Sequence, residues 1–115
     1  MINVNRAVVG GNLTKDPFLR KLGNGASVAS FRLAVNERFR AQDGSEKEDT
    51  CFVEIETWGK QAELCTERLR KGAPALVEGR LRYDAWEDKE SGSRRSKLLL
   101  KADRVHFLDS RREQR

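Results

Sequence analysis

Apolar and polar residues alternate along several stretches of the chain, and this period of two predicts β-strands. The clearest case is residues 27–36, where alternate positions hold Ala29, Phe31, Leu33 and Val35. Further strands are predicted over residues 5–11, 50–58, 73–83 and 97–108. The last of these contains three consecutive leucines, which predict a β-bulge or burial on both faces of the strand.

The period changes once, in the stretch KQAELCTERLRKG at residues 60–72. Ala62, Cys65 and Leu69 recur there at the spacing of one helical face, and Gly72 is a candidate C-cap. The pattern predicts one helix of about three turns. Gly23-Asn24-Gly25 predicts the tip of a hairpin, and the polar segments 38–49 and 84–96 are expected to be charged loops, the first of them mobile.

The predicted order of elements is three strands, one helix and two strands. In an all-β chain of this length, that order is typical of the five-stranded OB barrel, a Greek-key fold with its helix between strands 3 and 4. With 115 residues, we expect one domain over residues 1–110 and a short basic tail over 111–115.

Two aromatic residues of the third predicted strand occupy the polar phase of its alternation. Phe52 and Trp58 share their alternation phase with Glu54 and Glu56, while Cys51, Val53 and Ile55 occupy the phase that should face the core. Trp86 shares its phase with Arg80, Arg82 and Asp84, and Phe39 stands between Arg38 and Arg40. One aromatic in a strand is usually a core residue. Four in polar settings predict rings that face solvent.

Charge is distributed unevenly along the chain. The net charge of +5 combines +5 over residues 1–40, −6 over 41–67 and +6 over 68–115. Basic regions that flank an acidic one suggest a polyanion partner along part of the surface, and the alternative is a solvated surface of mixed charge. Exposed rings favour the first, because flat side chains stack on unpaired bases while Lys and Arg contact phosphates. Single strands are then expected rather than duplex DNA, whose base faces are hidden.

Other chemistry finds little support in the sequence. His106 lies among apolar residues, no phosphate-binding loop or nucleophile elbow occurs, and Cys51 and Cys65 form no C-x-x-C pair, so we expect two reduced thiols. We therefore expect no enzyme, no cofactor and no metal site. No apolar run approaches the length of a membrane span, and a soluble cytoplasmic protein is expected.

Four segments carry a family resemblance: NRAVVGGNLTKDPFLR, GNGASVASFRLAVNERFR, FVEIETWGKQAE and LRKGAPALVEGRLRYDAWED. Over residues 3–108 the chain resembles the bacterial-type single-stranded DNA-binding protein (SSB) family. The resemblance implies an OB-fold subunit that assembles, usually as a homotetramer, and wraps single-stranded DNA in replication, recombination and repair. The stacking aromatics of the family match Phe39, Phe52, Trp58 and Trp86. Its backbone-contacting basic residues match Lys60, Lys71 and Arg82, to which we add Arg38 and Arg40 from charge and proximity.

The sequence departs from that family at two places. Members usually end in a short acidic tip that recruits replication and repair enzymes, whereas residues 111–115 are basic, so either the chain is trimmed or it is a tailless member. Glu54 stands in a strand where relatives often carry basic residues. The main alternative function is a dimeric OB-fold module of the replication-restart kind that bridges replication proteins. RNA binding of the cold-shock type is disfavoured, since its early run of aromatics is missing.

Overall fold

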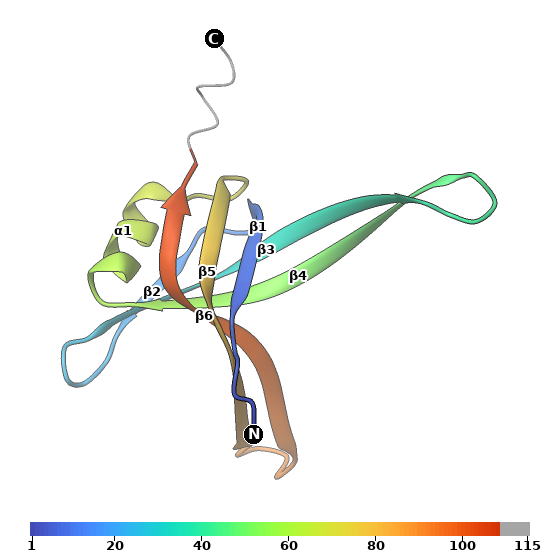
Figure 1. Ribbon diagram of the computed structural model, residues 1–115. Helices are drawn as coiled ribbons and strands as arrows, with labels where there is room; N and C mark the ends of the chain where they lie inside the picture. Colours follow the sequence, from blue (N-terminus) through green and yellow to red (C-terminus); the bar gives the residue numbers. More distant parts are fainter. Residues whose placement is uncertain (109–115) are drawn as a thin grey trace.

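The computed structural model describes residues 1–108, which form six β-strands and one helix (Figure 1). Their bounds are β1 Ala7–Leu13, β2 Phe18–Lys21, β3 Ser27–Arg40, β4 Glu46–Trp58, α1 Lys60–Arg68, β5 Pro74–Glu87 and β6 Arg94–Phe107. The predicted basic tail, residues 111–115, lies outside the described residues.

The strands form one sheet in the order β1-β5-β6-β4-β3-β2, and an additional pairing of β1 with β3 closes it. This closure pairs Asn12 with Ala34 and Leu13 with Leu33. On the other side of the barrel, a short parallel contact joins Ile55 of β4 to Leu100 of β6. Five strands thus close a barrel with the helix between β4 and β5, which is the OB fold, so the predicted fold class is confirmed.

The sixth strand, β2, lies outside the barrel and pairs with the first part of β3. The turn between β2 and β3 is closed by two hydrogen bonds, from the N–H of Leu22 to the carbonyl of Ala26 and from the N–H of Gly25 to the carbonyl of Leu22, and Gly25 adopts a φ of +88° there. Glycine is the residue that adopts this conformation without strain. The predicted hairpin tip at Gly23-Asn24-Gly25 is therefore confirmed.

The interior of the barrel is filled by the apolar phase of the strands. Leu33, Ile55, Val77 and Leu100 are fully buried or nearly so, and α1 and the residue after it add Ala62, Cys65 and Leu69. The helix is shorter than predicted, because it ends at Arg68 and Leu69 is already extended. Gly72, expected as the C-cap, lies beyond the helix end and donates its N–H to the carbonyl of Leu13.

The three consecutive leucines of β6 behave as predicted. Leu99 and Leu100 are both buried although they point to opposite faces, while Leu98 is exposed. Close by, Glu78 pairs with Arg104 and Gly79 with Ala102, so one residue of β6 is extra and forms a bulge. A side chain at Gly79 would collide with the backbone carbonyl of Lys101. The barrel therefore needs glycine at this crossing.

Two long hairpins extend from the barrel, and they occupy the segments predicted to be loops (Figure 1). That prediction was wrong. We define the β3–β4 arm as residues 36–50 and the β5–β6 arm as residues 81–98. Polar side chains pair across the first arm: Thr50 donates to Asn36 at 2.8 Å, and Arg38 lies 3.4 Å from Glu48. Polar residues can occupy a strand with two solvated faces because cross-strand pairs stabilise it without a core.

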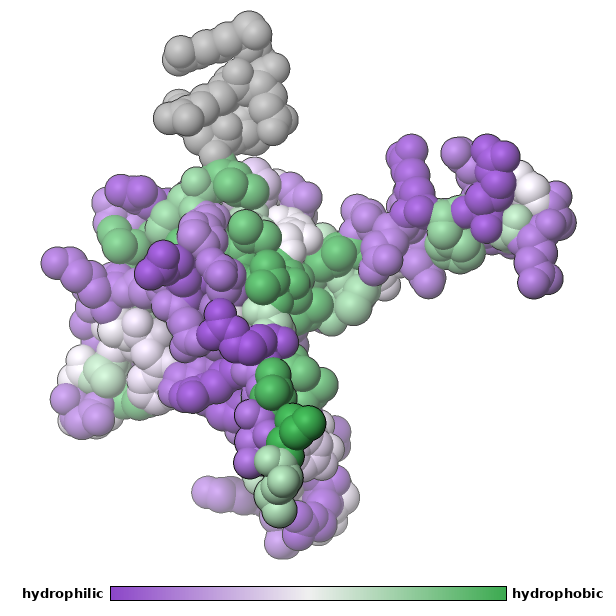
Figure 2. Space-filling view, in the orientation of Figure 1, coloured by the Kyte–Doolittle hydropathy of each residue, from purple (hydrophilic) through white to green (hydrophobic). Residues whose placement is uncertain are grey.

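Apolar surface gathers in the middle of the view in Figure 2, over β1 and the base of the β3–β4 arm, whereas the outer part of that arm is mostly hydrophilic. Val8 of β1 is 62% exposed. Within residues 1–108, no helix is both long and apolar enough to cross a bilayer.

Candidate nucleic-acid interface

All four aromatic residues predicted to face solvent do so. The exposed fractions are 49% for Phe39, 58% for Phe52, 37% for Trp58 and 46% for Trp86. These values are high for large apolar side chains, which are normally buried. The alternation phase gave the exposure of Phe52, Trp58 and Trp86 correctly, and the charged neighbours gave that of Phe39, but neither showed how the rings are grouped.

Three of these rings share one side of the sheet. Phe52, Glu56 and Trp58 are in phase on β4, and Trp86 is in phase with Arg82 on β5. The two groups face the same side, because the Arg82 guanidinium reaches the Glu56 carboxylate at 2.8 Å. Phe39 belongs to the other phase of the β3–β4 arm, since it pairs with Lys47 while Ala34 pairs with Phe52. The structure thus groups Phe52, Trp58 and Trp86, with Phe39 on the opposite phase of its arm.

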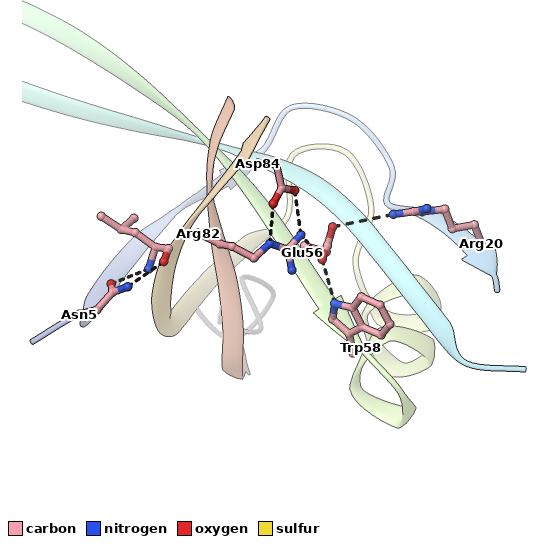
Figure 3. Close-up of polar contacts among 7 residues, drawn as sticks. Asn5, Arg20, Glu56, Trp58, Arg82 and Asp84 are labelled. Carbon is pink, nitrogen blue, oxygen red and sulfur yellow. Dashed lines mark hydrogen bonds and ion pairs between the residues drawn. The ribbon is translucent and has the colours of Figure 1, made fainter. Parts of the chain in front are cut away.

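Glu56 is at the centre of a polar cluster on this surface, where its carboxylate receives contacts from three side chains (Figure 3). It accepts a hydrogen bond from the indole Nε1 of Trp58 at 2.8 Å, and the guanidinium of Arg20 lies 3.9 Å away. Its phase assigned Glu56 to solvent, but only 7% of it is exposed. The expectation fails because Arg20 of β2, Trp58 of β4 itself and Arg82 of β5 cover the carboxylate while they satisfy it.

Arg82 is held between two carboxylates, as Figure 3 shows. Its Nε and Nη2 atoms donate to Asp84 at 3.0 and 3.1 Å, in addition to the contact with Glu56. Hydrogen bonding to Asp84, and then to Glu56, raises the pKa of Arg82 against the opposing effect of burial. The predicted phosphate contact of Arg82 therefore competes with two internal anions.

The other predicted basic residues are spread over the surface. Lys60 is exposed and begins α1, two residues after Trp58. Lys71 is exposed in the turn before β5, where its backbone N–H donates to Asp16. Arg38 has Glu48 as its ion-pair partner, and Arg40 pairs in register with Glu46. No ion pair or hydrogen bond within residues 1–108 joins Lys71 to the aromatic side chains.

Several side chains on this surface were missed in the sequence. Lys101 of β6 places its ammonium 5.6 Å from the centre of the Trp58 ring, and Arg32 of β3 lies 5.2 Å from that of Phe52. Phe18, the first residue of β2, is 66% exposed. Phe18 was not predicted as a site residue, because it follows the predicted turn at Asp16-Pro17. Only the phase that it shares with Arg20 indicates a strand there.

The remaining polar candidates lie elsewhere. His106 and Glu78 form a 2.6 Å contact on adjacent strands, and this hydrogen bond lowers the pKa of Glu78. Cys65 is fully buried, which raises the pKa of its thiol to about 12. Cys51 was expected to face the core but is exposed, because the barrel interior ends before this residue of β4. Within residues 1–108, no three His, Cys, Asp or Glu side chains gather to hold a metal ion.

A closed OB barrel with exposed rings and basic side chains on one side defines a class of oligonucleotide-binding domains. The model of the single-strand binding protein family matches residues 4–108, and the chain belongs to this family. A single-stranded DNA-binding protein from Helicobacter hepaticus is 42% identical over 107 residues, which cover 93% of this chain and 62% of that protein. This chain therefore spans less than two thirds of that relative.

Two solved structures have the same fold. A deletion mutant of the single-stranded DNA binding protein from Thermus aquaticus superposes with a TM-score of 0.83 and 30% identity, covering 94% of this chain and 52% of that one. A Plasmodium falciparum SSB, solved in complex with single-stranded DNA, gives a TM-score of 0.86 and 25% identity over 95% of this chain and 98% of that one.

Proposed function

We propose that this protein binds single-stranded DNA without sequence preference and protects it in replication, recombination and repair. The observation that carries the proposal is the grouping of Phe52, Trp58 and Trp86 on one side of the sheet, each ring open to solvent. A stacked base contributes ~1–3 kcal/mol, so these rings with Phe39 offer a gross ~4–12 kcal/mol before ordering costs. Stacking needs only the face of a base, which accounts for the lack of sequence preference.

Binding rather than catalysis is the whole of the proposed activity, and we place it in the cytoplasm with the DNA. Phosphate neutralisation comes from Lys60, Lys71 and Lys101. Arginines that form ion pairs with carboxylates contribute where a phosphate replaces the carboxylate. Each phosphate neutralised lowers the slope of log affinity against log salt by about 0.7 for single strands. Binding should therefore weaken steadily as salt is raised.

Assembly into a homo-oligomer, a tetramer in our proposal, has support on the opposite side of the β5–β6 arm. Tyr83 pairs with Leu98 across that arm, and their exposed fractions are 67% and 58%. Leu81, in the same phase as Tyr83, is 42% exposed, and Val8 on β1 is 62% exposed. Exposed apolar side chains in such number are typical of surfaces that other subunits cover. Light scattering of the full chain measures the assembly directly.

Trp86→Ala tests the proposed function. The variant should lose about 1–3 kcal/mol of affinity for a dye-labelled dT oligomer, measured by fluorescence anisotropy, because one stacking platform is removed. Trp58→Ala should lose a similar amount, and Trp86→Phe, which retains a ring, should lose much less. Thermal unfolding followed by circular dichroism controls for stability. Normal binding by both alanine variants would refute the site, and a wild-type chain that ignores poly-dT would refute the function.

A further inference from the structure

Phe18 is an exposed aromatic ring that none of the roles above uses. Its exposed fraction of 66% exceeds that of each of the four predicted stacking residues. In the strand register, Phe18 of β2 pairs with Ser30 of β3, and Ser30 pairs with Glu56 of β4. Residues that pair directly in antiparallel strands point to the same face. Phe18 therefore lies on the side of the sheet that carries Phe52 and Trp58.

A surface pocket of about 240 Å³ lies beside Phe18. Its lining comes from the β1–β2 loop and from β2, β3 and β4, and consists of Thr14, Lys15, Asp16, Phe18, Ser30, Phe31, Arg32 and Glu54. Arg32 connects the pocket to the predicted interface, since its guanidinium lies 5.2 Å from the centre of the Phe52 ring and 3.8 Å from Glu54. The pocket is thus continuous with the stacking surface.

The chemistry of the lining selects one part of a nucleotide. Two basic and two acidic side chains border the pocket, so their charges balance. A phosphate would gain no net attraction there, because repulsion by Asp16 and Glu54 offsets attraction by Lys15 and Arg32. An uncharged base, in contrast, would gain an aromatic face from Phe18. The edge of that base would meet the Ser30 hydroxyl, the Arg32 donors and the Glu54 acceptor, which are groups that bind base edges. This lining suits a nucleobase better than the sugar-phosphate backbone.

We propose that Phe18 and this pocket form an additional subsite for an unpaired base of the bound single strand. The subsite extends the interface from Phe52 across β3 to the β1–β2 loop. It rests on the proposed single-stranded DNA binding, because its occupant is part of the same strand. Glu54, which differs from the basic residues expected at its position, then faces a base edge rather than a phosphate.

The test compares Phe18→Ala and Phe18→Trp in the full chain, with dT oligomers of increasing length. Phe18→Ala should weaken binding roughly 5-fold to 100-fold, the effect of one stacked base, and only for oligomers long enough to reach from Phe52 to β2. Phe18→Trp keeps a stacking ring and should bind as the wild type does. A loss that ignored oligomer length would indicate a folding defect and would overturn the subsite.

A spectroscopic arm reports on the subsite directly. In a background of Trp58→Phe and Trp86→Phe, the indole introduced by Phe18→Trp is the sole tryptophan, since the chain has two. Its emission should be quenched when long dT oligomers are added and unchanged with short ones. Emission that no oligomer alters would overturn the subsite. So would Phe18→Ala with normal affinity but a changed mass in light scattering, which would make Phe18 a subunit contact.

The two proposals fail in different ways. Normal binding by Phe18→Ala together with weak binding by Trp86→Ala would remove the subsite and leave the proposed function intact. A wild-type chain that does not bind poly-dT would remove both. Loss of affinity in both variants, with Phe18→Ala affected only on long oligomers, is the result that supports both.

Discussion

Four of the five barrel strands continue into the two arms, and their side chains are buried in the barrel but exposed in the arms. On β3, Leu33 in the barrel is fully buried, whereas Phe39 in the arm is 49% exposed although it shares the same phase. On β5, Val77 is fully buried and Tyr83 is 67% exposed. Burial of the interior stabilises the barrel, and the arms contribute little interior of their own. The comparison teaches that stability and binding can be assigned to different parts of one strand.

The two arms also differ from each other in charge. The β3–β4 arm, residues 36–50, carries three basic and five acidic residues, whereas the β5–β6 arm, residues 81–98, carries five basic and four acidic ones. The arginines of the first arm stand opposite glutamates. A phosphate chain should therefore be attracted more strongly to the second arm, and the first should contribute chiefly through the ring of Phe39.

The largest expected effect is a loss of stability caused by a substitution in the barrel. Gly79→Ala should destabilise the protein by about 2 kcal/mol or more, because the new Cβ meets the Lys101 carbonyl and lies 2.9 Å from a methyl of Leu100. Urea unfolding followed by circular dichroism measures the loss. Gly23→Ala is the matched control, since no atom lies within 4 Å of a Cβ built there. Equal stability of both variants would contradict the close approach of the β6 backbone to Gly79.

Glu56→Gln should change both the stability of the protein and its affinity for DNA, because Glu56 is nearly buried and contacts Trp58 and Arg82 of the proposed interface. The amide keeps the shape and one acceptor but loses the charge, so stability should fall by about 1–2 kcal/mol. Arg82 keeps Asp84 and becomes more available to phosphates. Affinity for dT at low salt should rise, and the salt slope should steepen by about 0.7 if one more phosphate is neutralised. Weaker binding with an unchanged slope would show that Glu56 acts only by holding Trp58.

A smaller effect compares the arms by salt dependence. Lys97→Gln should reduce the salt slope of DNA binding by about 0.7, because Lys97 is in phase with Arg95 opposite Trp86. Arg38→Gln should reduce it by less than half of that, since Glu48 already lies 3.4 Å from Arg38. Binding titrations at several salt concentrations give both slopes. A larger change for Arg38→Gln would reverse the assignment of charge to the arms.

The smallest effect concerns thiol labelling and requires no substitution. Cys51, at the base of the β3–β4 arm, is exposed and should react quickly with a disulfide reagent. Cys65 should stay unreacted in the folded protein, because burial raises its pKa to about 12 and the thiolate is the reactive form. The number of cysteine thiols that react with the reagent, measured with and without urea, checks this prediction. Two fast thiols in the native protein would mean that the barrel interior opens easily.

Much of the fold follows from local pattern. Alternation along β3 and the interruption by one helical period predicted the barrel strands, the helix and their order. The three leucines of β6 predicted burial on both faces. These features are predictable because a buried face requires apolar residues at a fixed period, which is visible in any single strand. The arms were missed for the same reason, since a ribbon with two solvated faces has no such period to detect.

The exposure of Phe39, Phe52, Trp58 and Trp86 was also determined by the sequence, because each ring occurs in a polar phase or beside charged neighbours. Their grouping was decided only in the tertiary structure. Strand pairing placed Trp86 on the side of Phe52 and Trp58, set Phe39 on the other phase, and covered Glu56 with Arg82 and Arg20. These contacts join residues far apart in the chain, and the side-chain period of one strand carries no information about which strand will lie beside it.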